Sequence, residues 1–193
     1  MTLDLLKERE RGIEAQWARK HDEELIQKLR ERAKVREISD VLAKKLRVDD
    51  PALRQRLLDL GVTRETGPAL FFAPLIQIAW ADGKVSDRER DTILDMAAIR
   101  GVVPGGPAHA QILEWLRKAP AKELFDAAVD VLRVGISVLP GEEREQRVMT
   151  YAESFRRVAE ASGGKIGYLL GLRGSVSASE KALIETITAT LRG

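Results

Sequence analysis

The feature that most constrains the fold of this chain is a turn signature that occurs twice. In segment 81–89 an aspartate and a glycine follow an apolar run, and a Ser-x-x-Glu sequence begins at Ser86. Segment 161–180 repeats the pattern, with its Ser-x-x-Glu sequence at Ser177. This spacing is typical of a capping box, in which the serine and the glutamate each bond a free backbone amide at a helix start. We therefore predict two similar helix–turn–helix halves.

From residue 67 onward, apolar side chains recur at helical intervals, and glycine–proline clusters such as 104–107 and 139–141 separate the segments. The valine-rich stretches 102–103 and 134–138 could form strands, but neither has a plausible strand partner. We predict an all-α fold, a compact bundle of about six to seven helices from two pseudo-repeated halves, with a long charged N-terminal helix. Ile93 and Ile99 should face the core. The expected helices span 51–60, 68–81, 86–100, 108–118, 122–138, 142–161 and 177–191.

The N-terminal part of the chain differs in character from the rest. Residues 7–36 are rich in charge and contain no proline, and their sparse apolar residues form a narrow helical stripe. Such a stripe cannot bury a core, so it suits an exposed helix that lies on a partner or pairs with a second copy; a solvated extension is the simpler alternative. We divide the chain into a charged helical arm (1–48), a short helix and linker (49–66) and a helical domain (67–193).

Composition excludes several classes of function. The chain of 193 residues has no cysteine, which excludes disulfides, thiolate zinc sites and cysteine nucleophiles. Its net charge of +2 does not indicate nucleic-acid binding. The start of the chain has no signal-peptide pattern, so we expect a cytoplasmic protein. The most apolar run, 68–81, contains Pro74 and is shorter than the ~20 residues of a membrane span.

We expect no enzymatic activity. His21 lies in the charged arm and His109 follows a proline turn, and neither has a serine or aspartate at a spacing that suits nucleophilic catalysis. Segment 101–106 is rich in glycine but lacks the lysine and the preceding strand of a phosphate-binding loop. The glycine pair 163–164 ends a helix instead of starting one, which argues against phosphate binding there.

The first turn also offers ligands to a hard cation such as Ca²⁺, which prefers oxygen atoms. The calcium-loop pattern D-x-[DN]-x-[DN]-G is absent. Helix capping by itself explains the serine and the glutamate, which leaves Asp82 without a structural explanation. Ser162 replaces this acid in the second half, so the first turn is the candidate site and the second a candidate relic. The candidate ligands in this turn are Asp82, Ser86, Asp87 and Glu89.

The same turn carries a likeness to a known family. Segment 78–89, IAWADGKVSDRE, resembles the TerB-like family, which includes bacterial tellurite-resistance proteins and the soluble domain of a membrane DnaJ-like co-chaperone. The resemblance covers about residues 67–191. It implies an all-helical, non-enzymatic stress-response or regulatory domain with an acidic surface suspected of cation binding. At the matching positions it implies Asp82 and Glu89 as candidate ligands, together with Glu180.

The charged arm carries a second likeness, which rests on segments 9–18, 22–28 and 42–46. These resemble the zeta-type inhibitor of bacterial F-type ATPase, over about residues 3–61. Members of that family wedge this segment into the catalytic subunit interface and block rotation, which implies a protein–protein interaction for the arm. The family's later helices are absent here. The residues expected to contact a partner are Arg9, Glu10, Ile13, Glu14, Trp17, Glu24, Leu25 and Lys28.

Two interpretations follow from these residues and likenesses. The first is a cytoplasmic, non-enzymatic regulatory or stress-response protein with a TerB-like domain, able to bind a divalent cation, and a protein-binding helical arm. The alternative is an inhibitor of the F-type ATPase that acts through the N-terminal helix. Neither interpretation predicts a nucleic-acid partner or a membrane span.

Overall fold

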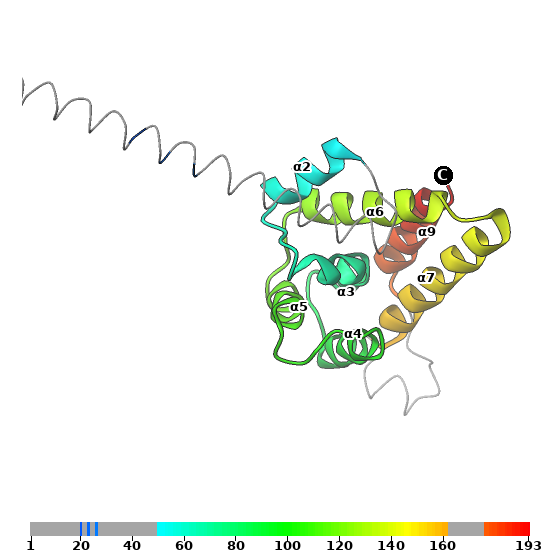
Figure 1. Ribbon diagram of the computed structural model, residues 1–193. Helices are drawn as coiled ribbons and strands as arrows, with labels where there is room; N and C mark the ends of the chain where they lie inside the picture. The colour runs from blue at the N-terminus through cyan, green and yellow to red at the C-terminus, as the bar shows by residue number, and fades with distance from the viewer. Residues whose placement is uncertain (1–19, 21–22, 24–25, 27–49, 162–175) are drawn as a thin grey trace, which may run out of the picture.

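The computed structural model describes residues 50–161 and 176–193 and, within the arm, Lys20, Glu23 and Ile26. The described part of the chain is entirely helical and contains no strand (Figure 1), which confirms the predicted fold class. None of its helices combines the length and the apolar composition needed to cross a membrane. The elements are α2 (Pro51–Asp59), the 3₁₀ helix η1 (Gly67–Phe72), α3 (Ala73–Ala79), α4 (Asp87–Ile99), α5 (Pro107–Arg117), α6 (Lys122–Ser137), α7 (Gly141–Ala161) and α9 (Ala178–Arg192).

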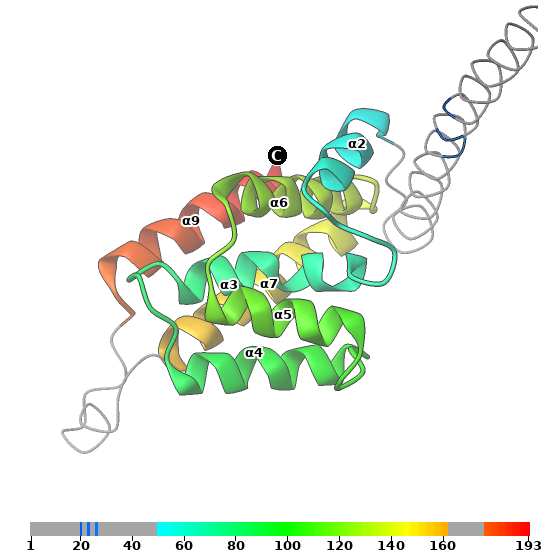
Figure 2. The same cartoon turned by 90° about the vertical axis from the view of Figure 1, so that its left-hand side faces the viewer.

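Helix α3 lies at the centre of the bundle. It packs against α4, α5, α6, α7 and α9, and Figures 1 and 2 show these helices around it. Leu75, Ile76 and Ile78 have no exposed surface, as expected of a segment that is apolar nearly all round. The predicted helix 68–81 is divided, because η1 precedes α3. Pro74, which has no amide hydrogen, stands in the first turn of α3, a position that proline tolerates.

Helix α2 belongs to the same core. It begins at Pro51, as predicted, and the carboxylate of Asp50 accepts hydrogen bonds from two backbone amides at 2.9 and 3.1 Å. Leu57 is fully buried, and the Arg56 guanidinium lies 3.1 Å from the carboxylate of Asp130 on α6. Of the segment 49–66, expected to be a short helix and linker, the described part 50–66 therefore packs on the body through α2.

Helix α4 differs from the sequence prediction at its last residue. Ile93 is fully buried, as predicted, but Ile99 is 81% exposed. The helix ends at Ile99, and Met96 and Ala97 complete its buried face one turn earlier. The prediction that Ile99 faces the core is therefore wrong.

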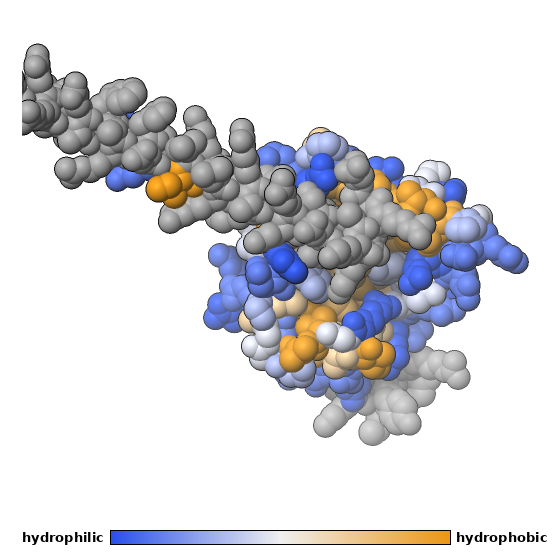
Figure 3. All heavy atoms as spheres, viewed as in Figure 1, coloured by the Kyte–Doolittle hydropathy of each residue, from blue (hydrophilic) through white to orange (hydrophobic). Residues whose placement is uncertain are grey.

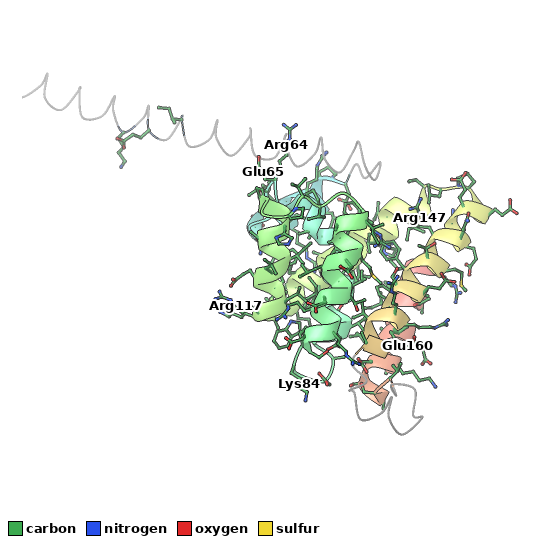
Figure 4. All side chains as sticks on the ribbon, turned by 90° about the horizontal axis from the view of Figure 1, so that it is seen from below. Arg64, Glu65, Lys84, Arg117, Arg147 and Glu160 are labelled. Atoms are coloured by element: carbon green, nitrogen blue, oxygen red, sulfur yellow. The ribbon has the colours of Figure 1, made fainter. Side chains whose placement is uncertain are left out.

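The body has two ends that differ in chemistry. Figure 2 shows the starts of α4 and α9 at one end and the connection from α4 to α5 at the other. Figure 4 places Lys84 and Glu160 toward the first end, and Glu65 and Arg147 toward the second. We call the first the acidic end, after Asp82, Glu89 and Glu180. The second, called the cleft end, carries an open cavity.

Candidate functional site

Both predicted capping boxes are present. At the start of α4, the Ser86 hydroxyl accepts a hydrogen bond from the Glu89 amide at 3.3 Å, and the Glu89 carboxylate accepts one from the Ser86 amide at 2.8 Å. At the start of α9, Ser177 and Glu180 make the same two bonds at 3.1 and 2.6 Å. A serine cap typically stabilises a helix by about 0.5–2 kcal/mol. The prediction of two matching helix starts is confirmed.

Both glutamates of these boxes are buried. Glu89 and Glu180 are each 2% exposed, although a carboxylate rarely lies so deep without a partner. One oxygen of each is held by its capping box. The positive ends of the two helix dipoles also favour negative charge at these places. Capping and the dipoles together explain how two carboxylates can be buried at one end of the body.

The two glutamates lie close enough for their charges to interact. Burial raises the pKa of Glu89, and the hydrogen bonds from Ser86 lower it. The negative charges of Glu180 and Asp82 raise the pKa of Glu89 further. Three acidic groups therefore crowd the acidic end, two from the start of α4 and its turn, and one from a helix distant in the sequence.

The structure gives Asp82 a local role that the sequence analysis did not find. Asp82 is exposed, and its carboxylate accepts a hydrogen bond from the Lys84 amide at 3.2 Å. This is the bond of an Asx turn, which aspartate forms readily. Gly83 between them has a φ of 88°, a conformation that favours glycine. Turn formation is therefore sufficient to account for Asp82, as capping is for Glu89.

The remaining candidate ligand of the first turn faces solvent. The Asp87 side chain is 85% exposed and pairs with Arg90 at 3.0 Å. Ser162 lies outside the described residues. Within residues 50–161 and 176–193, no three histidine, cysteine, aspartate or glutamate side chains are arranged so that they could hold a metal ion together. The structure therefore brings Glu89 and Glu180 together with Asp82 nearby, but not as a finished coordination site.

The raised pKa of Glu89 predicts a pH-dependent stability. A carboxyl whose folded pKa exceeds its usual value of 4.5 binds its proton more tightly when folded. Its contribution is complete below pH 4.5 and is lost as the pH rises through the folded pKa. Glu89→Gln removes the charge and keeps an oxygen for the Ser86 amide. We expect the unfolding free energy of the variant, relative to wild type, to increase from pH 4.5 upward and then level off.

Denaturant unfolding at a series of pH values, in buffers that contain a chelator, measures this difference. The chelator ensures that a bound cation does not alter the titration of Glu89. A difference between variant and wild type that stays constant with pH would show that the folded environment does not perturb this carboxyl.

A feature that the sequence analysis missed lies at the cleft end. A cavity of about 930 Å³ opens between η1, the connection from α4 to α5, the end of α6 and the first half of α7. Figure 3 shows apolar side chains gathered on the face that carries these segments. The end of α6 and the start of α7 follow one another in the sequence, but η1 and the connection from α4 to α5 are distant from them and from each other, and none of these segments carries a recognisable motif. Only the fold brings them together.

The other sequence candidates are placed as follows. The His109 ring accepts a hydrogen bond from the Gly105 amide at 3.4 Å, which gives it a role within its loop. In the arm, Lys20, Glu23 and Ile26 are helical and exposed. The eight arm residues expected to contact a partner lie outside the described residues, as does His21. They are Arg9, Glu10, Ile13, Glu14, Trp17, Glu24, Leu25 and Lys28.

Comparison of the chain with protein-family models, with curated proteins and with solved structures found no match. The function is therefore argued from the residues and their geometry.

Proposed function

We propose that this chain is a non-enzymatic regulatory protein of the TerB-like kind, whose acidic end binds a divalent cation. The main support is the meeting of two capped helix starts, which buries Glu89 and Glu180 close together beside the charge of Asp82. A divalent cation would neutralise this crowded negative charge. Carboxylate oxygens are also the ligands that Ca²⁺ and Mg²⁺ prefer.

The oxygens open to a cation follow from the hydrogen bonds. One oxygen of Glu89 and one of Glu180 are used in the capping boxes, and the other oxygen of each accepts no hydrogen bond from any described residue. Asp82 is exposed and held only by its turn. Binding would draw Asp82 inward toward the two glutamates. The acids must therefore move before they can share an ion.

A shared cation would link the two halves of the body. Asp82 and Glu89 belong to the connection from α3 to α4, whereas Glu180 belongs to α9. An ion that binds only the folded state raises the free energy of unfolding by RT ln(1 + [L]/Kd), where [L] is the free ion concentration and Kd is the dissociation constant of the ion. The cation would thus set how firmly the start of α9 is held against α4. This change gives the site a regulatory role without any chemical step.

Calorimetric titration of Ca²⁺, Mg²⁺ and Mn²⁺ into the full chain tests the site. We expect at least one of the three ions to bind the wild type, and Asp82→Ala to weaken its binding by about tenfold, which corresponds to ~1.4 kcal/mol. Asp95→Ala is the matched control, because Asp95 is an exposed acid on the same helix, away from the turn. The proposal fails if no ion binds the wild type. It also fails if Asp82→Ala binds the ion as tightly as the wild type and Asp95→Ala do.

The arm supports a second candidate function through its likeness to the ATPase inhibitor. In this proposal residues 1–48 bind a protein partner, and an F-type ATPase is the specific alternative. The full chain would then slow ATP hydrolysis by the purified enzyme, and a chain without the arm would not. Unchanged turnover at a large excess of the full chain would exclude this alternative and leave the cation proposal untouched.

A further inference from the structure

We propose that the cavity at the cleft end binds a small amphiphile with a carboxylate head and an apolar tail, of the long-chain carboxylic acid class. The site is distinct from the acidic end, so it does not depend on the cation proposal. Its support comes from an apolar wall, a fixed arginine and two polar groups that no described residue engages.

The wall of the cavity is largely apolar. Two of its residues, Val103 and Val138, are 70% and 47% exposed, although large apolar side chains are seldom left so open on two facing segments. Ile99, also exposed, directly precedes the lining residue Arg100. The apolar lining includes Phe71, Phe72, Val102, Leu132, Ile136 and Leu139. Such a surface suits a hydrocarbon chain that enters from solvent.

A fixed positive charge lies in this apolar wall. The Arg100 guanidinium lies over the ring of Phe72, at 5.8 Å, and over the ring of Tyr151, at 5.7 Å. It also donates a hydrogen bond to the Ser154 hydroxyl at 3.2 Å. These contacts hold the cation in one place, and an aromatic face stabilises it there. Arg100 is exposed as a residue, but these contacts place its guanidinium at the cleft, where it can attract a negative group.

Two further groups of the lining are free to bind a ligand. Arg147 is exposed and forms neither an ion pair nor a side-chain hydrogen bond with any described residue. The Tyr151 hydroxyl makes no hydrogen bond within the same part of the chain, although Tyr151 is buried. Burial raises the pKa of Tyr151, and the charges of Arg100 and Arg147 lower it, so both guanidiniums act on this phenol. Tyr151 thus stays protonated at neutral pH and can donate.

The negative side chains of the lining do not neutralise these groups. Glu65 lies well apart from Arg147 in Figure 4. Glu143 is one turn before Arg147 on α7, at a spacing that permits an ion pair, yet the two form none. A carboxylate placed between Arg147 and Tyr151 would receive a charge-assisted hydrogen bond from the first and a neutral one from the second. An anionic head group is therefore the complementary partner.

The size of the cavity favours a small molecule over a protein segment. Its volume of about 930 Å³ lies within the range of roughly 300–1,000 Å³ that is usual for small-ligand sites. Such sites combine apolar walls with a few convergent polar groups, as this one does. A long-chain carboxylate places its head at Arg147 and Tyr151 and its tail against Val103 and Val138.

Titration of decanoate into the full chain, followed by amide chemical shifts, tests this site. We expect saturable shifts concentrated in residues 100–103 and 147–151, and weaker binding of 1-decanol, which has the same tail without the charge. Arg147→Gln should weaken decanoate binding by about tenfold and leave 1-decanol binding unchanged. The exposed Arg147 side chain can be replaced without disturbing the core.

Two more variants complete the test. Arg156→Gln, a change of an exposed arginine elsewhere on α7, should bind decanoate as the wild type does. Val103→Asp, at an exposed wall position, should weaken the binding of both ligands. The inference is overturned if decanoate shifts no residues at the cleft, if 1-decanol binds as tightly as decanoate, or if the two arginine variants lose equal affinity.

Discussion

Replacing Phe155 with alanine is expected to lower the free energy of unfolding by about 3–5 kcal/mol. Phe155 has no exposed surface and lies on α7, which packs against α3, α4 and α9. Its ring lies 6.0 Å from the ring of Tyr151, so the variant loses an aromatic contact as well as buried area. The cavity that remains is closed in by helices on three sides and cannot collapse easily. Chemical denaturation followed by circular dichroism measures the loss.

Glu153→Ala is the matched control for Phe155→Ala. Glu153 lies on the same helix and is exposed, so this change should alter stability by no more than about 0.5 kcal/mol. A loss below about 1 kcal/mol for Phe155→Ala would show that α7 does not form the core contact described here.

Replacing Leu57 with alanine is expected to destabilise the whole body by about 2–5 kcal/mol. Leu57 is fully buried in α2, and its helix is also held to α6 by the ion pair between Arg56 and Asp130. If α2 is part of one core, the variant should still unfold in a single transition, at a lower denaturant concentration. Circular dichroism and tryptophan fluorescence should report the same midpoint.

Gln55→Ala, at an exposed position of the same helix, provides the comparison for Leu57→Ala and should change stability by about 0.5 kcal/mol or less. A minor, separate early transition in Leu57→Ala, with the main midpoint unchanged, would mean that α2 only rests on an independent domain that begins near residue 67. The measurement thus tests the domain boundary drawn from the sequence.

The parts of the fold that depend on local chemistry could be predicted from the sequence. The capping boxes at Ser86 and Ser177 need only a serine and a glutamate three residues apart. Most helix starts and ends follow from proline, glycine and apolar periodicity, but the division of segment 68–81 into η1 and α3 does not. Periodicity does not determine how far a buried face continues into the last turn, which is why the prediction for Ile99 is wrong.

The features that depend on tertiary contact could not be predicted. Only the likeness to the TerB-like family grouped Glu180 with Glu89. That the two share one end of the body depends on how α4 and α9 each pack against α3 and α7. The same limit applies to the cavity, whose Arg100 directly follows α4 and whose Arg147 lies on α7. Helix capping does not explain Asp82, and the sequence analysis did not predict the hydrogen bond from the Lys84 amide to its carboxylate. The available signal was an aspartate that directly precedes a glycine in a turn, two residues before Lys84.

The two ends of the body divide the proposed functions between them. The acidic end combines two buried carboxylates with an exposed one, and we infer a cation site there. The cleft end combines apolar walls with two guanidiniums, and the inferred ligand is an anion with an apolar tail. Helix α7 joins these regions, because it packs on α4 and α9 and also carries Tyr151 and Arg147. A ligand at one end can therefore influence the other only through packed helices, which the same variants can test.

The central claim, that a cation binds where α4 and α9 begin, is tested most directly by paramagnetic broadening. Substoichiometric Mn²⁺ is added to the isotope-labelled full chain, and the amide signals are recorded before and after the addition of a chelator. The account predicts reversible broadening that is strongest in residues 82–89 and 177–180 and is lost in Asp82→Ala. Broadening centred on other exposed acids such as Glu142, or no broadening at all, would contradict the account.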